Sequence, residues 1–338
     1  MPRILPTRSG VLGDGVVSDV VAEDSRKTVL SRILRLGLSY HGAPKEAPNS
    51  LILKIPLPER ADRPWGRHEV AFYTQVAPAM SAPPVPRCLD AVSDASTNAW
   101  HLLMEDLTDS HFTLGNWPLP PALDESERII AARARFHAEW WNDPRLGVLI
   151  GTWLDPGDPQ LEAFAKEVAR FAERVGDRLS SERRDLYHRL IDSGRHLNKR
   201  YHTHRHMTIV HGDSHVWNVF LPRLPNSNDV RLFDWDGWRV DVGTDDLAYM
   251  MALHWFPDHR RHTERHLLDH YHAVLCAHGV DGYDRSALDD DYRLSVLWQI
   301  ATPVWQAAND IPAWIWWNHL ERIFMAVDDL GCREFFSN

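Results

Sequence analysis

The sequence predicts an α+β protein of two lobes, a smaller one built on an antiparallel sheet and a larger one that is mainly helical. At 338 residues and 44% hydrophobic composition, the chain exceeds the usual size of one domain and can bury a substantial core. Its first hundred residues contain short runs rich in β-branched side chains. From Asp124 onward the apolar residues recur at helical spacing, which predicts helices in the second part.

The first part reads as several strands, one helix and a final strand. Strands are predicted at 16–22, 28–36 and 50–55, where Pro56 ends the run, and at 100–104. Between them, the stretch 68–77 carries Val70, Tyr73 and Val76 at helical spacing. We therefore place the boundary of the first lobe after Met104, so that it spans residues 1–104.

The second part alternates long helices with one strand-rich segment. Ile129, Arg133, Phe136 and Trp140 share one face of a helix that begins near Asp124, and further helices are predicted at 160–175 and 182–200. Short apolar bursts between 206 and 240 indicate strands and loops. The remainder from Asp245 reads as helices rich in tryptophan.

Charge and cysteine usage limit the possible partners and compartment. The net charge is −10, and residues 241–338 hold 16 acidic residues against 7 arginines, which gives 7 − 16 = −9. Such a field repels nucleic acid and anionic membranes, and it favours a cationic partner unless it only aids solubility. The three cysteines form no CxxC pair, and no apolar run reaches the length that spans a bilayer. We expect a cytoplasmic monomer or homodimer that binds neither nucleic acid nor membrane.

The segment HGDSHVWN, followed by FDWD, is the strongest chemical signal. Asp213 and Asn218 are five residues apart, and Asp234 follows an apolar run. Phosphoryl transfer needs an oriented hydroxyl and divalent cations that neutralise phosphate charge. A carboxylate near the acceptor serves the first need, and an amide oxygen with a second carboxylate serves the second, because Mg²⁺ prefers hard oxygen ligands.

With these motifs the sequence resembles the aminoglycoside phosphotransferase and choline kinase group, and more closely its ecdysteroid kinase-like relatives. The resemblance implies a bilobal protein-kinase-like fold, with Asp213 as catalytic base and with Asn218 and Asp234 as Mg²⁺ ligands. It also implies that Asp246, in the DLA sequence 246–248, braces the catalytic loop, and that His211 supports it.

The first lobe adds nucleotide-binding candidates to this resemblance. Lys54 ends the apolar strand LILK and resembles the kinase lysine that contacts the α- and β-phosphates, with Glu69 as its ion-pair partner. As alternatives, Lys54 is an edge-strand lysine and Glu69 a solvated helix residue. The turn with Gly13, Gly15 and Ser18 resembles a phosphate-covering turn, although a simple turn explains it as well.

The stretch HLLMEDL resembles the hinge between lobes. We accordingly predict a hinge at 105–110 and a second lobe at 111–338, with Glu105 to Leu107 against the adenine base. A buried strand followed by an acidic loop explains the same residues. ATP and Mg²⁺ are the implied cofactors, and GTP stays an alternative because the sequence does not show how the hinge selects a base.

The acceptor is expected to be a hydroxyl of a small molecule such as an antibiotic, sterol, sugar or amino alcohol. HGD replaces the HRD of protein kinases, DWD replaces DFG, and no APE-like segment follows, so a protein substrate is not expected. The acidic second lobe favours a cationic acceptor. The residues chosen for its pocket are Asp241, Asp245, Trp238 and Asp310. Asp236 is left with two roles, contact with a second metal or capping of a turn.

Two rival functions remain open at this stage. One is a catalytically silent nucleotide-binding protein on the same scaffold. The other is a metallohydrolase that uses the histidines between His254 and His272, of which 262/266 and 266/270 have the i,i+4 spacing of helical metal ligands. No HExxH motif accompanies them, so a polar helix face is the preferred interpretation.

Overall fold

The chain forms two compact units that do not follow a single cut in the sequence. The computed structural model describes residues 15–28, 31–60, 66–115, 119–153 and 156–336. Unit 1 comprises residues 1–113 and 218–238, and unit 2 comprises residues 114–217 and 239–338. The chain therefore passes between the units three times, and the segment that contains Asn218 and Asp234 belongs with the N-terminal sheet.

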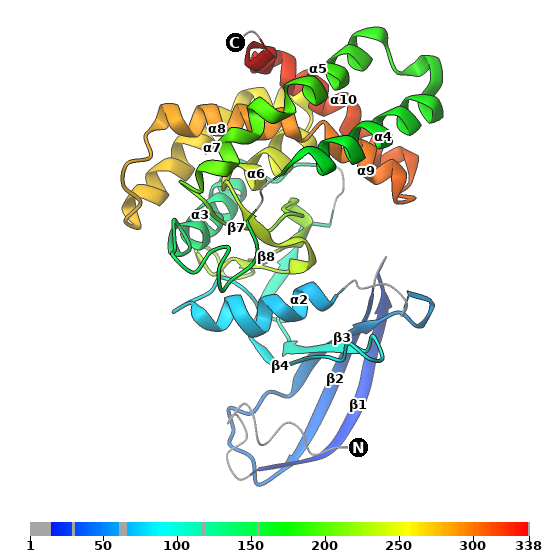
Figure 1. The fold of residues 1–338 in the computed structure, drawn as a ribbon. Coiled ribbons are helices and arrows are strands. Elements are labelled where there is room, and N and C mark those ends of the chain that lie inside the picture. Colours follow the sequence, from blue (N-terminus) through cyan, green and yellow to red (C-terminus); the bar gives the residue numbers. More distant parts are fainter. Residues whose placement is uncertain (1–14, 29–30, 61–65, 116–118, 154–155, 337–338) are drawn as a thin grey trace. The chain divides into compact units, whose positions relative to one another are not determined.

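Unit 1 is built on a five-stranded antiparallel sheet with strand order β1-β2-β3-β5-β4 (Figure 1). Its strands are β1 (Val16–Lys27), β2 (Ser31–His41), β3 (Ser50–Pro56), β4 (Cys88–Ser93) and β5 (Trp100–Glu105). In β3, Leu51 and Lys54 are the buried positions, and Lys54 pairs in register with Ile33 of β2 and Leu102 of β5. The central position of β3 thus fixes where the Lys54 side chain starts.

One helical segment and a small second sheet complete unit 1. Helix α2 (Arg67–Ala71) continues as a π-helical turn over Phe72–Val76 and packs against β4 and β5. The second sheet has the order β6-β8-β9, with β6 (His111–Thr113), β8 (Val219–Pro222) and β9 (Arg231–Leu232). Gly66 starts α2 at φ +85° with the ring of Trp100 against its Cα, a position where any Cβ would clash.

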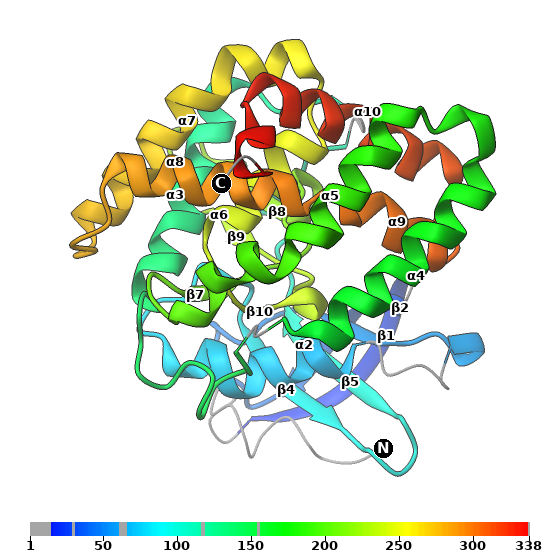
Figure 2. The ribbon, with the colours of Figure 1, turned by 45° about the horizontal axis from the view of Figure 1, so that its top comes forward.

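Unit 2 is mainly helical, with a two-stranded sheet of β7 (Thr208–Val210) and β10 (Arg239–Asp241). Its helices are α3 (Leu123–Glu139), α4 (Asp158–Val175), α5 (Ser181–Leu197), α6 (Thr244–Leu247), α7 (Pro257–Ala277), α8 (Arg285–Trp298), α9 (Ala301–Ala308) and α10 (Ala313–Asp329). Helix α3 packs on α7, and α4 packs on α5 and α9 (Figure 2). Large side chains that fill the core include Phe136, Trp140, Tyr187, Trp255 and Tyr271.

The mixed α+β class predicted from the sequence is confirmed, and most elements lie where periodicity placed them. The predicted helix at 68–77 corresponds to the segment 67–76, and the predicted strand at 50–55 to β3. Strand β4 was not predicted, because CLDAVS lacks an alternating apolar pattern and a β-bulge interrupts its pairing between Cys88 and Asp90. Among the described residues, no helix is both long and apolar enough to cross a bilayer.

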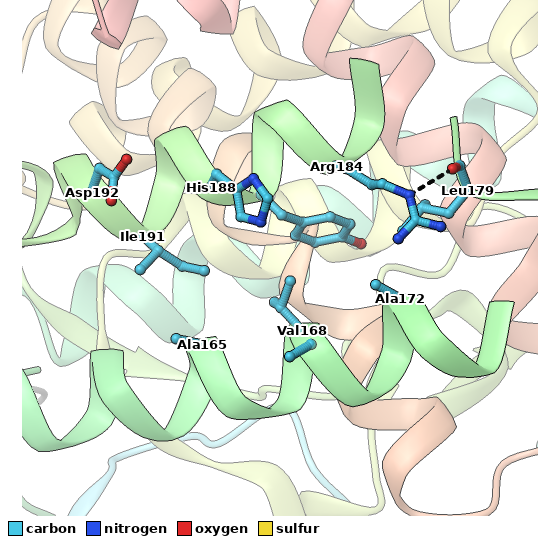
Figure 3. Close-up of a pocket in the computed structure, with 10 residues that line it drawn as sticks. Ala165, Val168, Ala172, Leu179, Arg184, His188, Ile191 and Asp192 are labelled. Atoms are coloured by element: carbon cyan, nitrogen blue, oxygen red, sulfur yellow. Dashed lines mark hydrogen bonds between the residues drawn. The ribbon is translucent and has the colours of Figure 1, made fainter. Parts of the chain in front are cut away.

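A cavity of about 440 Å³ lies between α4 and α5. Figure 3 shows Ala165, Val168 and Ala172 of α4 on one side, with His188, Ile191 and Asp192 of α5 facing them. Arg184 closes one end through a 3.1 Å hydrogen bond from its Nε to the Leu179 carbonyl. None of the residues that line this cavity is among the predicted site residues.

Candidate active site

Lys54 is the centre of a buried charge cluster in unit 1. Its Nζ lies 2.6 Å from Oε2 of Glu69 on α2 and 2.6 Å from Oδ1 of Asp234 after β9. The Lys54 side chain is 10% exposed, that of Glu69 1%, and that of Asp234 43%. Three segments distant in the sequence thus place two carboxylates on one ammonium group.

The electrostatics of this cluster follow from its burial. Burial alone would lower the pKa of Lys54, but the charges of Asp234 and Glu69 outweigh it and raise that pKa. Burial raises the pKa of Glu69, and the charges of Asp234 and Asp236 add to this effect, while Lys54 opposes it. The ammonium is therefore permanently charged, and it is the group on which both acids depend.

Asp236 joins the DWD segment to helix α2. Its Oδ1 accepts hydrogen bonds from the backbone N–H groups of Gly66 at 2.9 Å and Glu69 at 3.3 Å, so it caps the first turn of α2. The Trp235 ring stacks on Phe72 with ring centroids 4.0 Å apart, and the backbone N–H of Trp235 donates to Glu69 Oε1 at 3.4 Å. The segment that carries Asp234 and the helix that carries Glu69 are thereby fixed to each other.

Asn218 and Asp234 are brought together by the β8–β9 hairpin of unit 1. Asn218 immediately precedes β8, and its carbonyl accepts a 3.1 Å hydrogen bond from the N–H of Phe233. Phe220 stacks on Phe233 at 4.1 Å, which holds the two strand ends in register. Asp234 follows with φ +67°, a left-handed conformation that Asp adopts more readily than most residues and that turns the chain after β9.

The HGD loop lies in unit 2 and is held by Asp246. Its carboxylate accepts the backbone N–H groups of His211 at 2.9 Å and Gly212 at 3.0 Å. Arg133 and His137 of α3 contact the same carboxylate at 3.4 and 3.3 Å. Although burial acts to raise it, hydrogen bonding from His137 and the charge of Arg133 lower the pKa of Asp246 well below its usual range. Asp246 is therefore an ionised support for the loop that presents Asp213.

The side chain of Asp213 is contacted by ring-bearing residues of unit 2. The Tyr249 hydroxyl donates to Asp213 Oδ1 at 2.7 Å, and His215 Nε2 lies 3.5 Å from Oδ2. Burial would raise the pKa of Asp213, but the charge of His215 and the Tyr249 hydrogen bond lower it below its ordinary value. The carboxylate is thus ionised near neutral pH and oriented by a phenol.

With this geometry established, comparison with known proteins gives a consistent result. Residues 157–279 match the model of the ecdysteroid kinase-like family. A crystal structure assigned as an aminoglycoside phosphotransferase, from Ralstonia eutropha, has a TM-score of 0.59 at 17% identity and covers 97% of this chain and 95% of its own. The chain has the protein-kinase-like fold. The resemblance drawn from the motifs is confirmed.

Two further structures share this kinase-like fold. A choline/ethanolamine kinase family protein from Mesorhizobium loti has a TM-score of 0.51 at 13% identity and covers 98% of this chain and 95% of its own. Amicoumacin kinase, crystallised with AMP-PNP and Ca²⁺, has a TM-score of 0.52 at 14% identity and covers 90% and 87%. No curated protein sequence matches the chain.

The predicted phosphate-covering turn has a different setting from the one expected of a turn between two strands. Gly13 lies outside the described residues, Gly15 precedes β1, and Ser18 lies within β1. Strand β1 continues from Val16 to Lys27 and β2 begins at Ser31, so Ser18 does not lie in the connection between these two strands. On its flanks the Thr28 N–H donates to the Ser31 carbonyl at 2.8 Å.

The predicted hinge residues already make backbone contacts within unit 1. The Glu105 N–H donates to the Arg87 carbonyl at 2.9 Å, and the Leu107 carbonyl accepts from the N–H groups of Ser110 and His111. Asp106, between them, accepts from Arg35 and Ser50 at 2.6 and 2.7 Å. The contact of this segment with a nucleotide base stays a prediction.

The acids chosen for an acceptor pocket are engaged in structural contacts. Asp241 and Asp245 both pair with Arg239, and Gln299 donates to Asp245 at 2.9 Å. Trp238 belongs to unit 1, where its indole donates to the His68 carbonyl at 2.9 Å. Asp310 is exposed, with φ +58° after α9.

The histidines between His254 and His272 are dispersed over α7 and its preceding turn. His262 contacts the Asp258 carbonyl, His266 lies 2.5 Å from Glu127, and His272 contacts the Tyr283 carbonyl. Within the described ranges, no group of three His, Cys, Asp or Glu side chains could hold a metal ion. His254 differs from the others, because it is buried among rings close to Asp213.

Sequence reasoning missed Tyr249, His215 and His254 near the candidate base, and His319 beside His254. Tyr249 lies in η8 (Ala248–Leu253), which His254 directly follows, and His319 lies in α10, so no spacing rule connects residue 319 with residue 213. One signal was present: Tyr249 directly follows the DLA sequence whose Asp246 braces the HGD loop, so it starts from a backbone position next to that loop.

Proposed function

We propose that this protein is a small-molecule kinase that transfers the γ-phosphate of ATP to a hydroxyl group. The observation that carries the proposal is the Lys54 cluster, in which one ammonium lies 2.6 Å from both Glu69 and Asp234. This pairing is the arrangement that kinases use to hold the nucleotide phosphates and a metal ligand. The family match, the fold and the order of the motifs support the same activity.

The donor set near Asp234 fits a magnesium ion. Asn218 contributes an amide oxygen and Asp234 a carboxylate, both hard oxygen ligands. The Asp234 side chain stays 43% exposed although it contacts Lys54, so it is accessible to an ion from solvent. When bound, Mg²⁺ would neutralise charge on the β- and γ-phosphates. Lys54 would then pair with phosphate oxygens while Glu69 keeps its ammonium in place.

Asp213 would act on the acceptor. Its ionised carboxylate accepts the hydrogen bond of the incoming hydroxyl and orients the oxygen toward the γ-phosphorus. The Tyr249 hydroxyl donates to Oδ1 of Asp213 and His215 Nε2 lies 3.5 Å from Oδ2, so these two side chains hold the carboxylate in position for the acceptor. Because its pKa is lowered, Asp213 takes the proton as the new P–O bond forms and not before.

Measurement of ADP formation against a broad library of hydroxylated metabolites and antibiotics, with MgATP as donor, tests the proposal. Asp213→Asn and Asp234→Asn should each lower the rate of transfer by about 10²- to 10⁴-fold. Lys54→Ala should raise KM for ATP and lower kcat. Asp281→Asn, an exposed aspartate of unit 2, is the matched control and should retain full activity.

Thermal melting separates loss of chemistry from loss of fold. Asp213→Asn should melt close to the wild-type temperature, whereas Asp234→Asn stays folded but melts lower, because it also removes a charge partner of Lys54. Full activity of Asp234→Asn in Mg²⁺ would remove Asp234 from the metal site. ATP hydrolysis that no acceptor accelerates, unchanged by Asp213→Ala, would instead support a catalytically silent nucleotide-binding protein. GTP belongs in the same assay, since a 2′-aminoglycoside phosphotransferase of this fold was crystallised with GDP.

A further inference from the structure

A cluster of five rings lies beside Asp213 in unit 2. We call it the ring cluster, and it consists of His215, Trp217, Tyr249, His254 and His319. His254 is its centre, with ring centroids 4.3 Å from His319, 4.8 Å from Tyr249, 5.5 Å from His215 and 5.9 Å from Trp217. Tyr249 and His215 also contact the two oxygens of Asp213. The cluster therefore adjoins the group that would receive the acceptor hydroxyl.

The two deepest histidines of the ring cluster are neutral. His254 Nδ1 donates to the Tyr249 carbonyl at 2.8 Å, and His319 Nδ1 donates to Gln306 Oε1 at 2.9 Å, so each leaves Nε2 as an acceptor. Burial lowers the pKa of His254 to about 3 and lowers that of His319 as well. His254 and His319 thus present uncharged ring faces, each with Nε2 as an acceptor.

Two buried imidazole nitrogens of the cluster lack a protein partner. His215 Nδ1 and His319 Nε2 make no hydrogen bond to any part of the chain that the structure describes. Unpaired buried polar atoms are rare in folded proteins because they cost free energy. A ligand with a polar group besides the reacting hydroxyl would satisfy them.

Charges around the ring cluster disfavour a cationic ligand. Arg322 donates to the His254 carbonyl, which places a permanent positive charge near the centre of the cluster. Asp245, whose charge also acts on Tyr249, is ion-paired with Arg239. The groups here that would attract an ammonium are the faces of Trp217 and Tyr249 and the Asp213 carboxylate, which Tyr249 and His215 already contact. With Arg322 close by and Asp245 neutralised, burial of an ammonium here would be poorly compensated.

We propose that the ring cluster is the acceptor subsite, and that it selects uncharged, ring-bearing alcohols over their amino derivatives. The inference rests on the proposed function, because it assigns the acceptor of the same Asp213. It reverses the expectation of a cationic acceptor that the acidic second lobe had suggested. The total charge of the lobe does not decide the matter, since the acids concerned are paired with arginine.

Matched pairs of small ring alcohols test this inference. One pair is trans-4-methylcyclohexanol and trans-4-aminocyclohexanol, and a second is 4-methylbenzyl alcohol and 4-(aminomethyl)benzyl alcohol. ADP formation is measured with MgATP at pH 7.5, and binding by saturation-transfer NMR with AMP-PNP and Mg²⁺. The neutral member of each pair should be preferred about tenfold, which corresponds to about 1.4 kcal/mol.

Two variants should shift this preference toward the amine. His254→Asp adds a carboxylate at the centre of the cluster and should reduce the ratio about tenfold. Gln306→Glu keeps the hydrogen bond to His319 with an isosteric carboxylate, so it tests the same idea if His254→Asp fails to fold. His262→Asp, an exposed α7 position, makes the same substitution outside the cluster and should leave the ratio unchanged.

Preference of the wild-type protein for the amines, a ratio that neither cluster variant moves, or no binding of either neutral alcohol would overturn the inference. Failure of the proposed function has a different signature. If the amines are phosphorylated in an Asp213-dependent reaction, only the subsite assignment is wrong. If the library yields no transfer to any hydroxyl, the kinase assignment itself fails.

Discussion

The candidate residues of unit 1 and those of unit 2 handle charge in different ways. In unit 1, Lys54 pairs with the carboxylates of Glu69 and Asp234, and the nearby Asp236 carboxylate accepts hydrogen bonds from the backbone of α2. In unit 2, Asp213 is contacted by the rings of His215 and Tyr249, and the charge of His215 together with the Tyr249 hydrogen bond lowers its pKa. The Lys54 cluster offers an ammonium group to a polyanion such as a nucleoside triphosphate. The ring cluster, as proposed above, suits a compact uncharged alcohol.

The largest expected effect comes from breaking the buried pair in unit 1. Glu69→Ala leaves Lys54 with Asp234 alone and should lower the free energy of unfolding by about 3–5 kcal/mol, because a buried charge loses a partner. Glu59→Ala removes the exposed partner of Lys27 at 3.1 Å and should leave the free energy of unfolding close to that of the wild type, because solvent screens this pair. Urea denaturation measures both. Equal losses in the two variants would show that the Lys54 cluster is not set apart by its burial.

A smaller effect is expected from a change at Tyr249 in the ring cluster of unit 2. Tyr249→Phe removes the hydrogen bond that favours the ionised form of Asp213, so the pKa of Asp213 should rise. Protonation of Asp213 abolishes its role, and the acid limb of the kcat/KM profile should therefore move to higher pH, with kcat lower by about tenfold. Tyr40→Phe removes a hydroxyl that contacts the Pro48 carbonyl at 2.6 Å and should not move this limb. An unshifted limb in Tyr249→Phe would separate Tyr249 from the base.

The smallest expected effect tests how helix α2, which carries Glu69, is held in unit 1. Asp236→Ala removes the cap of α2 and should lower the free energy of unfolding by about 1 kcal/mol, while KM for ATP rises because α2 carries Glu69. Asp284→Ala removes the N-cap of α8, whose Oδ1 accepts from Ala287 at 2.8 Å. It should cost similar stability without a change in KM. Equal KM values in the two variants would reduce Asp236 to a simple cap.

The charged residues of unit 1 could be predicted from the sequence because their signals are local. Lys54 ends an apolar strand, Glu69 lies on the next periodic helix, and Asp234 follows a short strand, so each residue is marked by the element that carries it. The ring cluster of unit 2 could not be predicted in this way. Tyr249 reaches Asp213 from η8 (Ala248–Leu253), and His319 reaches His254 because α10 packs on η8, an arrangement that no periodicity in the sequence specifies.

Asp236 has two possible roles in the sequence, and the structure shows its carboxylate in contact with the start of α2. From the sequence, it was left between a metal contact and a turn cap. The backbone N–H groups of Gly66 and Glu69 lie within hydrogen-bond distance because Gly66 adopts a positive φ at the start of α2. That contact joins residues 170 positions apart in the chain, so local pattern alone could not reveal it.

The return of residues 218–238 to unit 1 affects how the protein can be made. Lys54 lies 180 positions before its partner Asp234. During synthesis, the first 113 residues leave the ribosome without β8, β9 and the carboxylate that completes the cluster. A nascent chain therefore lacks the segment that packs on β6 and α2 until residue 238 has emerged, and a fragment cut at the first crossing would lack part of its own fold.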